Sequence, residues 1–166
     1  ICRFAPLTFK VGEGSFGSQQ KQALFPGVEW LVSGEVSSST LDIAAPGNIR
    51  FAPDPHWITV PSMGVFSNDG LLCGLAWEAT QEWAPGKIMP AAAFASPNFL
   101  ENQNNHYLSL FLPSIPDHVL PNQLTASLPY DLLKNSWMDL EARIILDAAP
   151  KDTISLVDHW LDLHGH

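Results

Sequence analysis

Apolar and polar residues alternate with a period of two along several segments of the chain, which is the pattern of a β-strand with one buried face. The clearest case is a pair of segments, residues 57–66 and 71–78, separated by Asn68-Asp69-Gly70. These three residue types tolerate the left-handed backbone of a tight turn, so the pair predicts a β-hairpin. Its second strand places four apolar residues on one face, namely Leu71, Cys73, Leu75 and Trp77.

Other apolar segments predict further strands. They are residues 3–11, 28–32, 91–95, 106–112 and 137–147. Pro6 favours an edge position for the first of them, because proline cannot donate to a strand ladder. In the last segment a row of apolar residues alternates with charged ones, which is typical of an antiparallel sheet with one solvated side. The apolar row is Met138, Leu140, Ala142 and Ile144.

The period changes to that of a helix near the C-terminal end. Apolar residues of the segment 152–164 recur at helical spacing, with Trp160 on the apolar side. Asp152 or Thr153 is placed to cap the start and Gly165 to end the helix. We therefore expect a C-terminal α-helix that lays Trp160 on the sheet.

Taken together, the pattern predicts a mainly β fold, an antiparallel β-sandwich with a C-terminal α-helix. A supersandwich of the galactose-mutarotase-like kind is one form that it could take. The length of 166 residues fits a single domain spanning 1–166. The chain begins at Ile1 without a Met or a signal-peptide pattern, so we expect it to be a piece of a longer chain.

The chain is acidic and poor in ions. Its formal net charge is -9 and charged residues make up 15%. An acidic surface excludes nucleic acid and disfavours an anionic membrane, because both need a basic patch. The shortage of charge suggests that a neighbouring domain or a second copy covers part of the surface, so a homodimer is one expected partner arrangement.

Cysteine and histidine usage offers no cofactor or metal site. Cys73 lies in an apolar strand pattern and is expected to be a buried free thiol, although a disulfide with Cys2 stays open. The histidines lack the spacing of a zinc site. We therefore expect no metal and no cofactor.

Catalysis would have to come from carboxylates. A glycoside hydrolase needs two of them about 5 to 10 Å apart. Glu78 ends a predicted strand beside Trp77 and is the catalytic candidate, while the plain alternative is a solvated or hydrogen-bonded strand-end carboxylate. An enzyme would require the pKa of such a group to be raised in a pocket.

Aromatic and amide side chains suggest sugar recognition. Trp30, Trp57, Trp77 and Trp83 lie on or near predicted strands, and the segment 98–106 is rich in amides. Indoles stack on sugar rings and amides bind hydroxyl groups. The predicted ligand-binding residues are Trp77, Trp83, Asn102, Asn104, His106 and Tyr107. The alternative is that the indoles belong to the core and the loop is merely solvated.

Three stretches resemble a β-sandwich accessory domain of large bacterial carbohydrate-processing, glycoside hydrolase-like proteins. They are residues 24–31, the segment 54–77 with its hairpin, and residues 90–97; the closing Leu163-His164-Gly165 is also similar. The resemblance implies an exported bacterial protein, extracellular or periplasmic, with catalysis elsewhere in the polypeptide. It carries over no catalytic residue.

Three functions remain open from the sequence. The leading one is a non-catalytic carbohydrate-associated module that binds glycan or braces a neighbouring catalytic domain. The second is a glycoside hydrolase or polysaccharide lyase with its site on the sandwich. The third is a structural assembly domain, which predicts a large exposed apolar patch.

Overall fold

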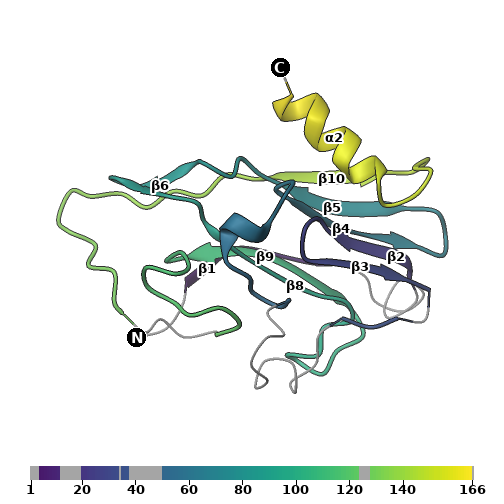
Figure 1. The fold of residues 1–166 in the computed structure, drawn as a ribbon, viewed down its shortest axis with the longest axis horizontal. Helices are drawn as coiled ribbons and strands as arrows, with labels where there is room; N and C mark the ends of the chain where they lie inside the picture. The colour runs from purple at the N-terminus through teal and green to yellow at the C-terminus, as the bar shows by residue number, and fades with distance from the viewer. Residues whose placement is uncertain (1–3, 12–19, 34, 38–49, 124–127, 166) are drawn as a thin grey trace.

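The computed structural model describes residues 4–11, 20–33, 35–37, 50–123 and 128–165 (Figure 1). The protein is mainly β, with antiparallel strands and a helix at the C-terminal end. The strands are β1 (Phe4–Val11), β2 (Gln20–Phe25), β3 (Glu29–Val32), β4 (Ser62–Ser67), β5 (Leu72–Ala76), β6 (Glu82–Ala84), β7 (Lys87–Ile88), β8 (Ala91–Ala95), β9 (His106–Leu112) and β10 (Arg143–Asp147). The helices are the 3-10 turn η1 (Pro55–Trp57) and α2 (Ser155–His164).

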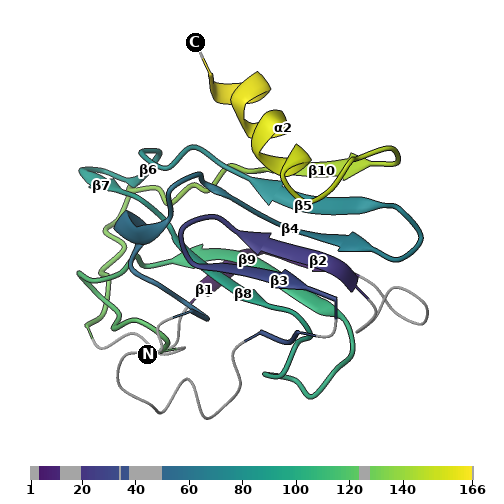
Figure 2. The same cartoon turned by 45° about the vertical axis from the view of Figure 1, so that its right-hand side comes forward.

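The strands form two main sheets and a small ribbon. The larger sheet has five strands in the order β10-β5-β4-β2-β3, and the smaller has three in the order β1-β9-β8. Strands β6 and β7 form a separate two-stranded ribbon (Figure 2). The larger sheet therefore has two more strands than the smaller one.

One apolar core joins both main sheets. The five-stranded sheet contributes Met63, Val65, Cys73 and Leu75, and the three-stranded sheet contributes Ala92, Phe94, Leu108 and Leu110. The rings of Phe25 and Phe94 meet across it with their centroids 5.8 Å apart. Alternate residues of β2, β4, β5, β8 and β9 enter this core, as the period-two pattern requires.

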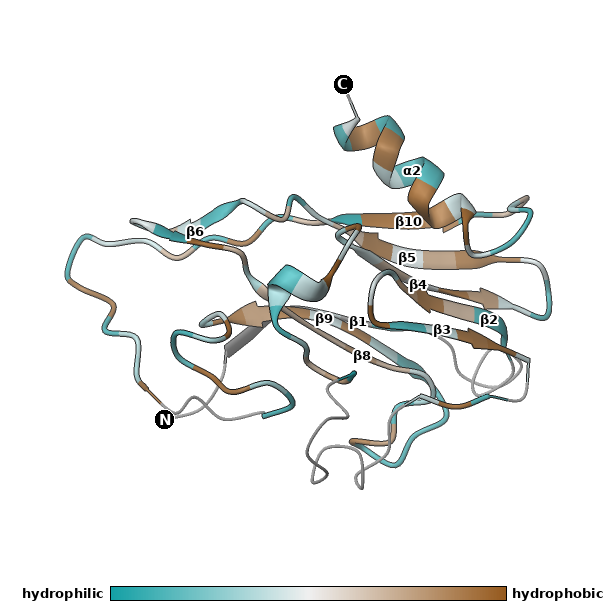
Figure 3. Ribbon diagram, in the orientation of Figure 1, coloured by the Kyte–Doolittle hydropathy of each residue, from teal (hydrophilic) through white to brown (hydrophobic). Residues whose placement is uncertain are grey.

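Helix α2 packs on the opposite face of the five-stranded sheet. Leu156 is fully buried there among Phe66, Leu72, Ala76 and Ile145, with Trp160 against the same cluster. The indole Nε1 of Trp160 donates to the carbonyl of Trp77 over 3.0 Å. The prediction that Trp160 lies on the sheet is confirmed, and Figure 3 shows the apolar stripe of the helix.

The predicted hairpin exists, but its first strand is shorter than expected. Gly70 has φ 87, and the Ser67 N–H donates to the Leu71 carbonyl over 2.9 Å. Strand β4 starts only at Ser62, so the prediction of a strand from Trp57 is wrong over its first half. Residues 55–57 form η1 instead, because Asp54 accepts the His56 N–H at 3.0 Å and Pro55 favours a helical start.

The segment 137–147 is a strand only from Arg143. Before it the chain follows the ribbon through isolated bonds, such as the Asp139 N–H to the Trp83 carbonyl at 2.9 Å. Leu140 and Ala142 do pack on the core, as expected. Ile144 is 55% exposed, whereas Ile145 is 7% exposed. Ile144 lies on the predicted apolar face, opposite Leu75 of the core, but it is exposed at the edge of the sheet, while Ile145 is buried under α2 on the other face.

The helix begins later than predicted. Its first residue is Ser155, and Thr153 points its hydroxyl to Gln22 Oε1 at 2.9 Å instead of capping. Asp152 Oδ1 accepts the Ile154 N–H at 2.8 Å in the turn before the helix. Strands β2, β6 and β7 were not predicted; β6 and β7 are each too short to show a period.

Cys73 is a buried free thiol, and burial raises its pKa. Cys2, the other candidate for a disulfide, lies outside the described residues. In the described part of the chain no helix is long and apolar enough to cross a membrane.

Candidate functional site

The two indoles chosen as sugar platforms are core residues. Trp77 is 2% exposed and belongs to the main core. Trp83 is fully buried, where its Nε1 donates to the Ile88 carbonyl at 3.1 Å and its ring lies 5.1 Å from that of Tyr130. Neither indole face is open to a ligand. The interpretation of these two residues as sugar platforms is corrected to a packing role.

His106 is likewise buried, so a ligand cannot reach it from solvent. Its Nδ1 lies 2.7 Å from the hydroxyl of Ser96, and that hydroxyl also bonds Gln20 Oε1. All three side chains are buried, on strands β2, β8 and β9 or next to them. This network ties the two main sheets together, because Gln20 starts β2 of the larger sheet while His106 starts β9 of the smaller one.

The amide-rich segment is divided between bonded and exposed residues. Asn98 and Asn105 are buried and bond each other at 3.0 Å, which closes the loop internally. Tyr107 is half-buried beside Phe51, with ring centroids 6.4 Å apart. Asn102 and Asn104 are exposed, and Asn102 has φ 53 in a turn. The structure therefore does not bring the six predicted ligand residues together at one surface.

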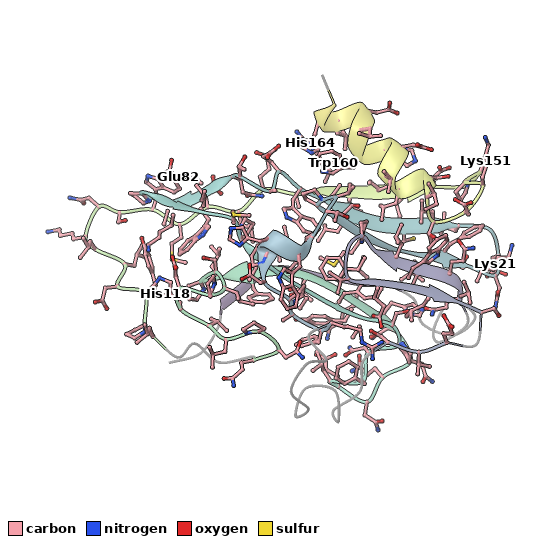
Figure 4. The ribbon with its side chains drawn as sticks, in the orientation of Figure 1. Lys21, Glu82, His118, Lys151, Trp160 and His164 are labelled. Atoms are coloured by element: carbon pink, nitrogen blue, oxygen red, sulfur yellow. The ribbon has the colours of Figure 1, made fainter. Side chains whose placement is uncertain are left out.

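Glu78 borders a small hollow between the end of β5 and the C-terminal turn of α2. The hollow has a volume of about 140 Å³ and is lined by Ala76, Trp77, Glu78, Gln81, Glu141, Ala142, Arg143 and His164. Figure 4 shows His164 and Trp160 on α2, and their rings lie 5.3 Å apart. Ligand pockets usually measure about 300–1,000 Å³, so this hollow is too small for a sugar ring with its contacts.

The electrostatics of Glu78 do not suit acid catalysis. Its Oε1 accepts the Thr80 N–H at 3.1 Å and the Thr80 hydroxyl at 2.8 Å, and His164 Nδ1 lies 3.6 Å from Oε2. The Thr80 backbone and side-chain hydrogen bonds, with a smaller effect of His164, lower the pKa of Glu78. A general acid near neutral pH needs the opposite shift. Glu78 is a carboxylate just after the end of β5 that accepts hydrogen bonds from Thr80.

A second hollow lies along the edge strand β3. Its volume is about 550 Å³ and its lining residues are Val28, Glu29, Trp30, Leu31, Glu35, Val36 and Arg50. This volume lies within the range of small-molecule sites. Trp30 is 54% exposed, which makes it an indole that a ligand can reach. Alternation along β3 places Trp30 on the outer face and Glu29 on the inner one, so the hollow runs along the strand edge.

The charged groups of this hollow are held in place. Glu29 Oε2 accepts the Ser37 hydroxyl at 2.7 Å, and Arg50 Nη1 lies 3.3 Å from Glu29 Oε1. Glu35 Oε2 accepts the Val32 N–H at 2.9 Å in the turn after β3. A charge pair and an exposed indole at one strand edge can hold a polar ligand with an apolar face. Arg50 was missed by sequence reasoning, because only the fold brings it to the hollow beside Trp30.

Within the residues that the structure describes, no group of three His, Cys, Asp or Glu side chains is placed to hold a metal ion. The fold is that of a mainly β protein with antiparallel sheets and a C-terminal helix. Comparison with known proteins finds no matching family model, no similar curated protein and no similar solved structure.

Proposed function

We propose that the chain is a non-catalytic β-sandwich module, associated with carbohydrate processing, that braces a neighbouring domain of the same polypeptide. The observation that carries this proposal is the segment 128–137. Four of its large apolar side chains are exposed, namely Leu128, Leu132, Leu133 and Trp137. Exposed apolar groups gathered in this way are typical of a surface that another body covers.

The segment is anchored at its base and carries its exposed apolar side chains between polar ones. The Leu128 N–H donates to the His118 carbonyl at 3.0 Å, and Tyr130 packs on the buried ring of Trp83. Figure 1 shows it as a long loop that stands away from the main sheets. Because the loop is anchored, little conformational entropy is lost when a neighbouring domain binds it. Burial of the leucines in that interface would therefore be favourable.

Hydrogen–deuterium exchange tests the bracing role. Amides of 128–137 are expected to exchange quickly in the isolated chain and at least tenfold more slowly in the full-length polypeptide that contains it. Leu132→Ser with Leu133→Ser should abolish the added protection and leave the melting temperature of the isolated chain unchanged, because both side chains are exposed. Equal exchange in both contexts would contradict the proposal. Asp131→Ser is the matched exposed control.

The hollow along β3 favours a second candidate, the binding of a neutral glycan. Its support is an indole that a sugar ring can reach beside the Glu29–Arg50 pair. Isothermal titration against a panel of neutral and acidic glycans tests it. Trp30→Ala should abolish any binding that is found, while Trp137→Ala, which removes another exposed indole elsewhere (45%, against 54% for Trp30), should retain it. Absence of binding across the panel would exclude this candidate and leave the bracing role.

A further inference from the structure

Strand β10 forms an unprotected edge of the five-stranded sheet. In the part of the chain that the structure describes, it pairs with β5 and with no other strand, and Figures 1 and 2 show it as the outermost strand. Its register with β5 is continuous from Arg143 to Asp147, without a bulge. The strand also contains neither Pro nor Lys. Bulges, proline and lysine help to keep edge strands from pairing, and β10 has none of them; its charged residues, Arg143 and Asp147, stand at its two ends, so this edge is open to another strand of matching charge.

The contrast with another edge strand is clear. Strand β1, at the edge of the smaller sheet, contains Pro6 and has a register shift between Phe4 and Leu7. Both features interrupt a ladder and discourage pairing on the free side. Strand β10 has the regular backbone that a partner strand needs.

The inner face of β10 is apolar and uncovered. Ile144 and Leu146 lie opposite Leu75 and Cys73 in the ladder, and those two residues of β5 are buried in the main core. Ile144 is 55% exposed and Leu146 is 66% exposed. The core therefore stops at β5, while the same sheet face continues one strand further.

The sequence of β10 is complementary to itself in the antiparallel direction. When two copies are aligned about Ile145, Arg143 of each lies opposite Asp147 of the other, and Ile144 lies opposite Leu146. Opposite charges and paired apolar side chains are the combinations that stabilise antiparallel neighbours. A two-fold axis requires a surface to be complementary to itself, and this five-residue strand meets that requirement.

The charged residues at the two ends of β10 each have a partner within the chain, and the Asp147 side chain is 23% exposed. Arg143 contacts Glu141 at 3.2 Å with 61% of its side chain exposed, and Asp147 contacts His159 at 2.9 Å. The Ala149 N–H and His159 lower the pKa of Asp147, so it is a carboxylate at neutral pH. Helix α2 packs over β4 and β5 through Leu156, on the face opposite to Ile144 and Leu146.

We propose that the protein forms a two-fold symmetric homodimer in which β10 pairs antiparallel with β10 of a second copy about Ile145. The two five-stranded sheets then become one continuous sheet across the interface. The interface buries Ile144 and Leu146 of both copies in one apolar row. It is separate from the segment 128–137, so it does not depend on the bracing role.

Sedimentation equilibrium of the chain tests the proposal. The expected mass at micromolar concentration is twice the 18.2 kDa of one chain. Arg143→Asp and Asp147→Arg, each alone, should raise the dimer dissociation constant about tenfold, because each substitution places like charges opposite each other at two symmetry-related positions. The combined variant Arg143→Asp/Asp147→Arg restores opposite charges and should return to within about threefold of the original value.

Two further variants complete the experiment. Lys134→Asp makes the same charge change as Arg143→Asp on an exposed loop and should leave the dissociation constant unchanged. Ile144→Lys should yield a monomer with the melting temperature of the dissociated parent, since Ile144 contributes an exposed side chain. A monomer at all concentrations would overturn the proposal. So would a dimer that the single charge reversals leave intact, or one that the combined variant fails to restore.

Discussion

Leu156 of α2 lies directly on Gly74 of β5. A Cβ built on the glycine would be 2.5 Å from Leu156 Cδ1 and 3.1 Å from the Met63 carbonyl oxygen. The neighbouring Gly64 of β4 is similar, because a Cβ built on it would be 3.2 Å from Leu156 Cδ2. Because Gly74 and Gly64 have no side chains, these two adjacent strands leave room for the side chain of Leu156, which is fully buried there.

We expect Gly74→Ala to destabilise the protein by about 1–3 kcal/mol, because the new methyl group overpacks a site with no free volume. Leu156→Ala should cost about 2–5 kcal/mol through the cavity that it leaves. Urea unfolding of both variants and of the double variant measures the coupling. The double variant should be more stable than the sum of the single effects predicts, since each substitution relieves the defect of the other. Strict additivity would contradict the contact.

The hydrogen bond from Trp160 to the Trp77 carbonyl should also be measurable. Trp160→Phe keeps most of the ring but removes the N–H donor, and the expected cost is about 1 kcal/mol. Trp137→Phe serves as the control, because that indole is 45% exposed. Thermal unfolding should show a lower melting temperature for the first variant only. Equal melting temperatures would mean that the bond contributes nothing to the docking of α2.

The buried network of Gln20, Ser96 and His106 should contribute to the joining of the two sheets. Ser96→Ala removes the hydroxyl that contacts both other side chains, and we expect a loss of about 1–3 kcal/mol in the free energy of unfolding. Ser33→Ala changes an exposed serine and should have little effect. Chemical denaturation of the two variants compares them directly. A similar, small effect of both would show that the network is dispensable.

The lowered pKa of Glu78 predicts a specific dependence on pH. A carboxylate whose folded pKa lies below its unfolded value stabilises the folded state above the unfolded pKa, and this contribution disappears as pH falls through the folded pKa. Glu78→Gln should therefore be less stable than the parent at pH 7 and equally stable at about pH 2–3. We expect less than about 1 kcal/mol, because the side chain is 48% exposed.

An NMR titration of the Glu78 side-chain carboxyl carbon checks the same point. Thr80→Val removes one donor of the carboxylate and should bring the pKa closer to its ordinary value. A pKa at or above the ordinary value in the parent would contradict this hydrogen-bonded arrangement. It would also reopen the question of acid catalysis at this position.

The strands that sequence predicted well are those whose pattern is local and strong. The hairpin turn at Gly70, strand β8 and strand β9 all lie where short apolar segments and turn residues placed them. The segment before Ser62 and the one before Arg143 were predicted as strands because they also alternate. They form no strand ladder, because their backbone groups make hydrogen bonds within turns or to isolated partners instead. Some of these partners, such as Trp83 and Gln81, lie far away in the sequence, so a local pattern cannot reveal them.

The candidate site shows a similar division. Sequence identified the indoles as a set, but not which of them a ligand could reach. Trp77 and Trp83 are sealed in packed clusters, while Trp30 lies on the outer face of an edge strand. The exposure of an indole depends on which layer lies over it, and residues far away in the chain form that layer.

By itself, the sequence determined that this protein is built of antiparallel strands with a closing helix, because side-chain period and turn chemistry act over a few neighbouring residues. The tertiary structure alone decided which faces stay open. The larger sheet has five strands and the smaller three, and α2 covers the opposite face. That mismatch of widths leaves Ile144 and Leu146 exposed beside a core that buries their neighbours, and no local pattern encodes how many strands a distant sheet will have.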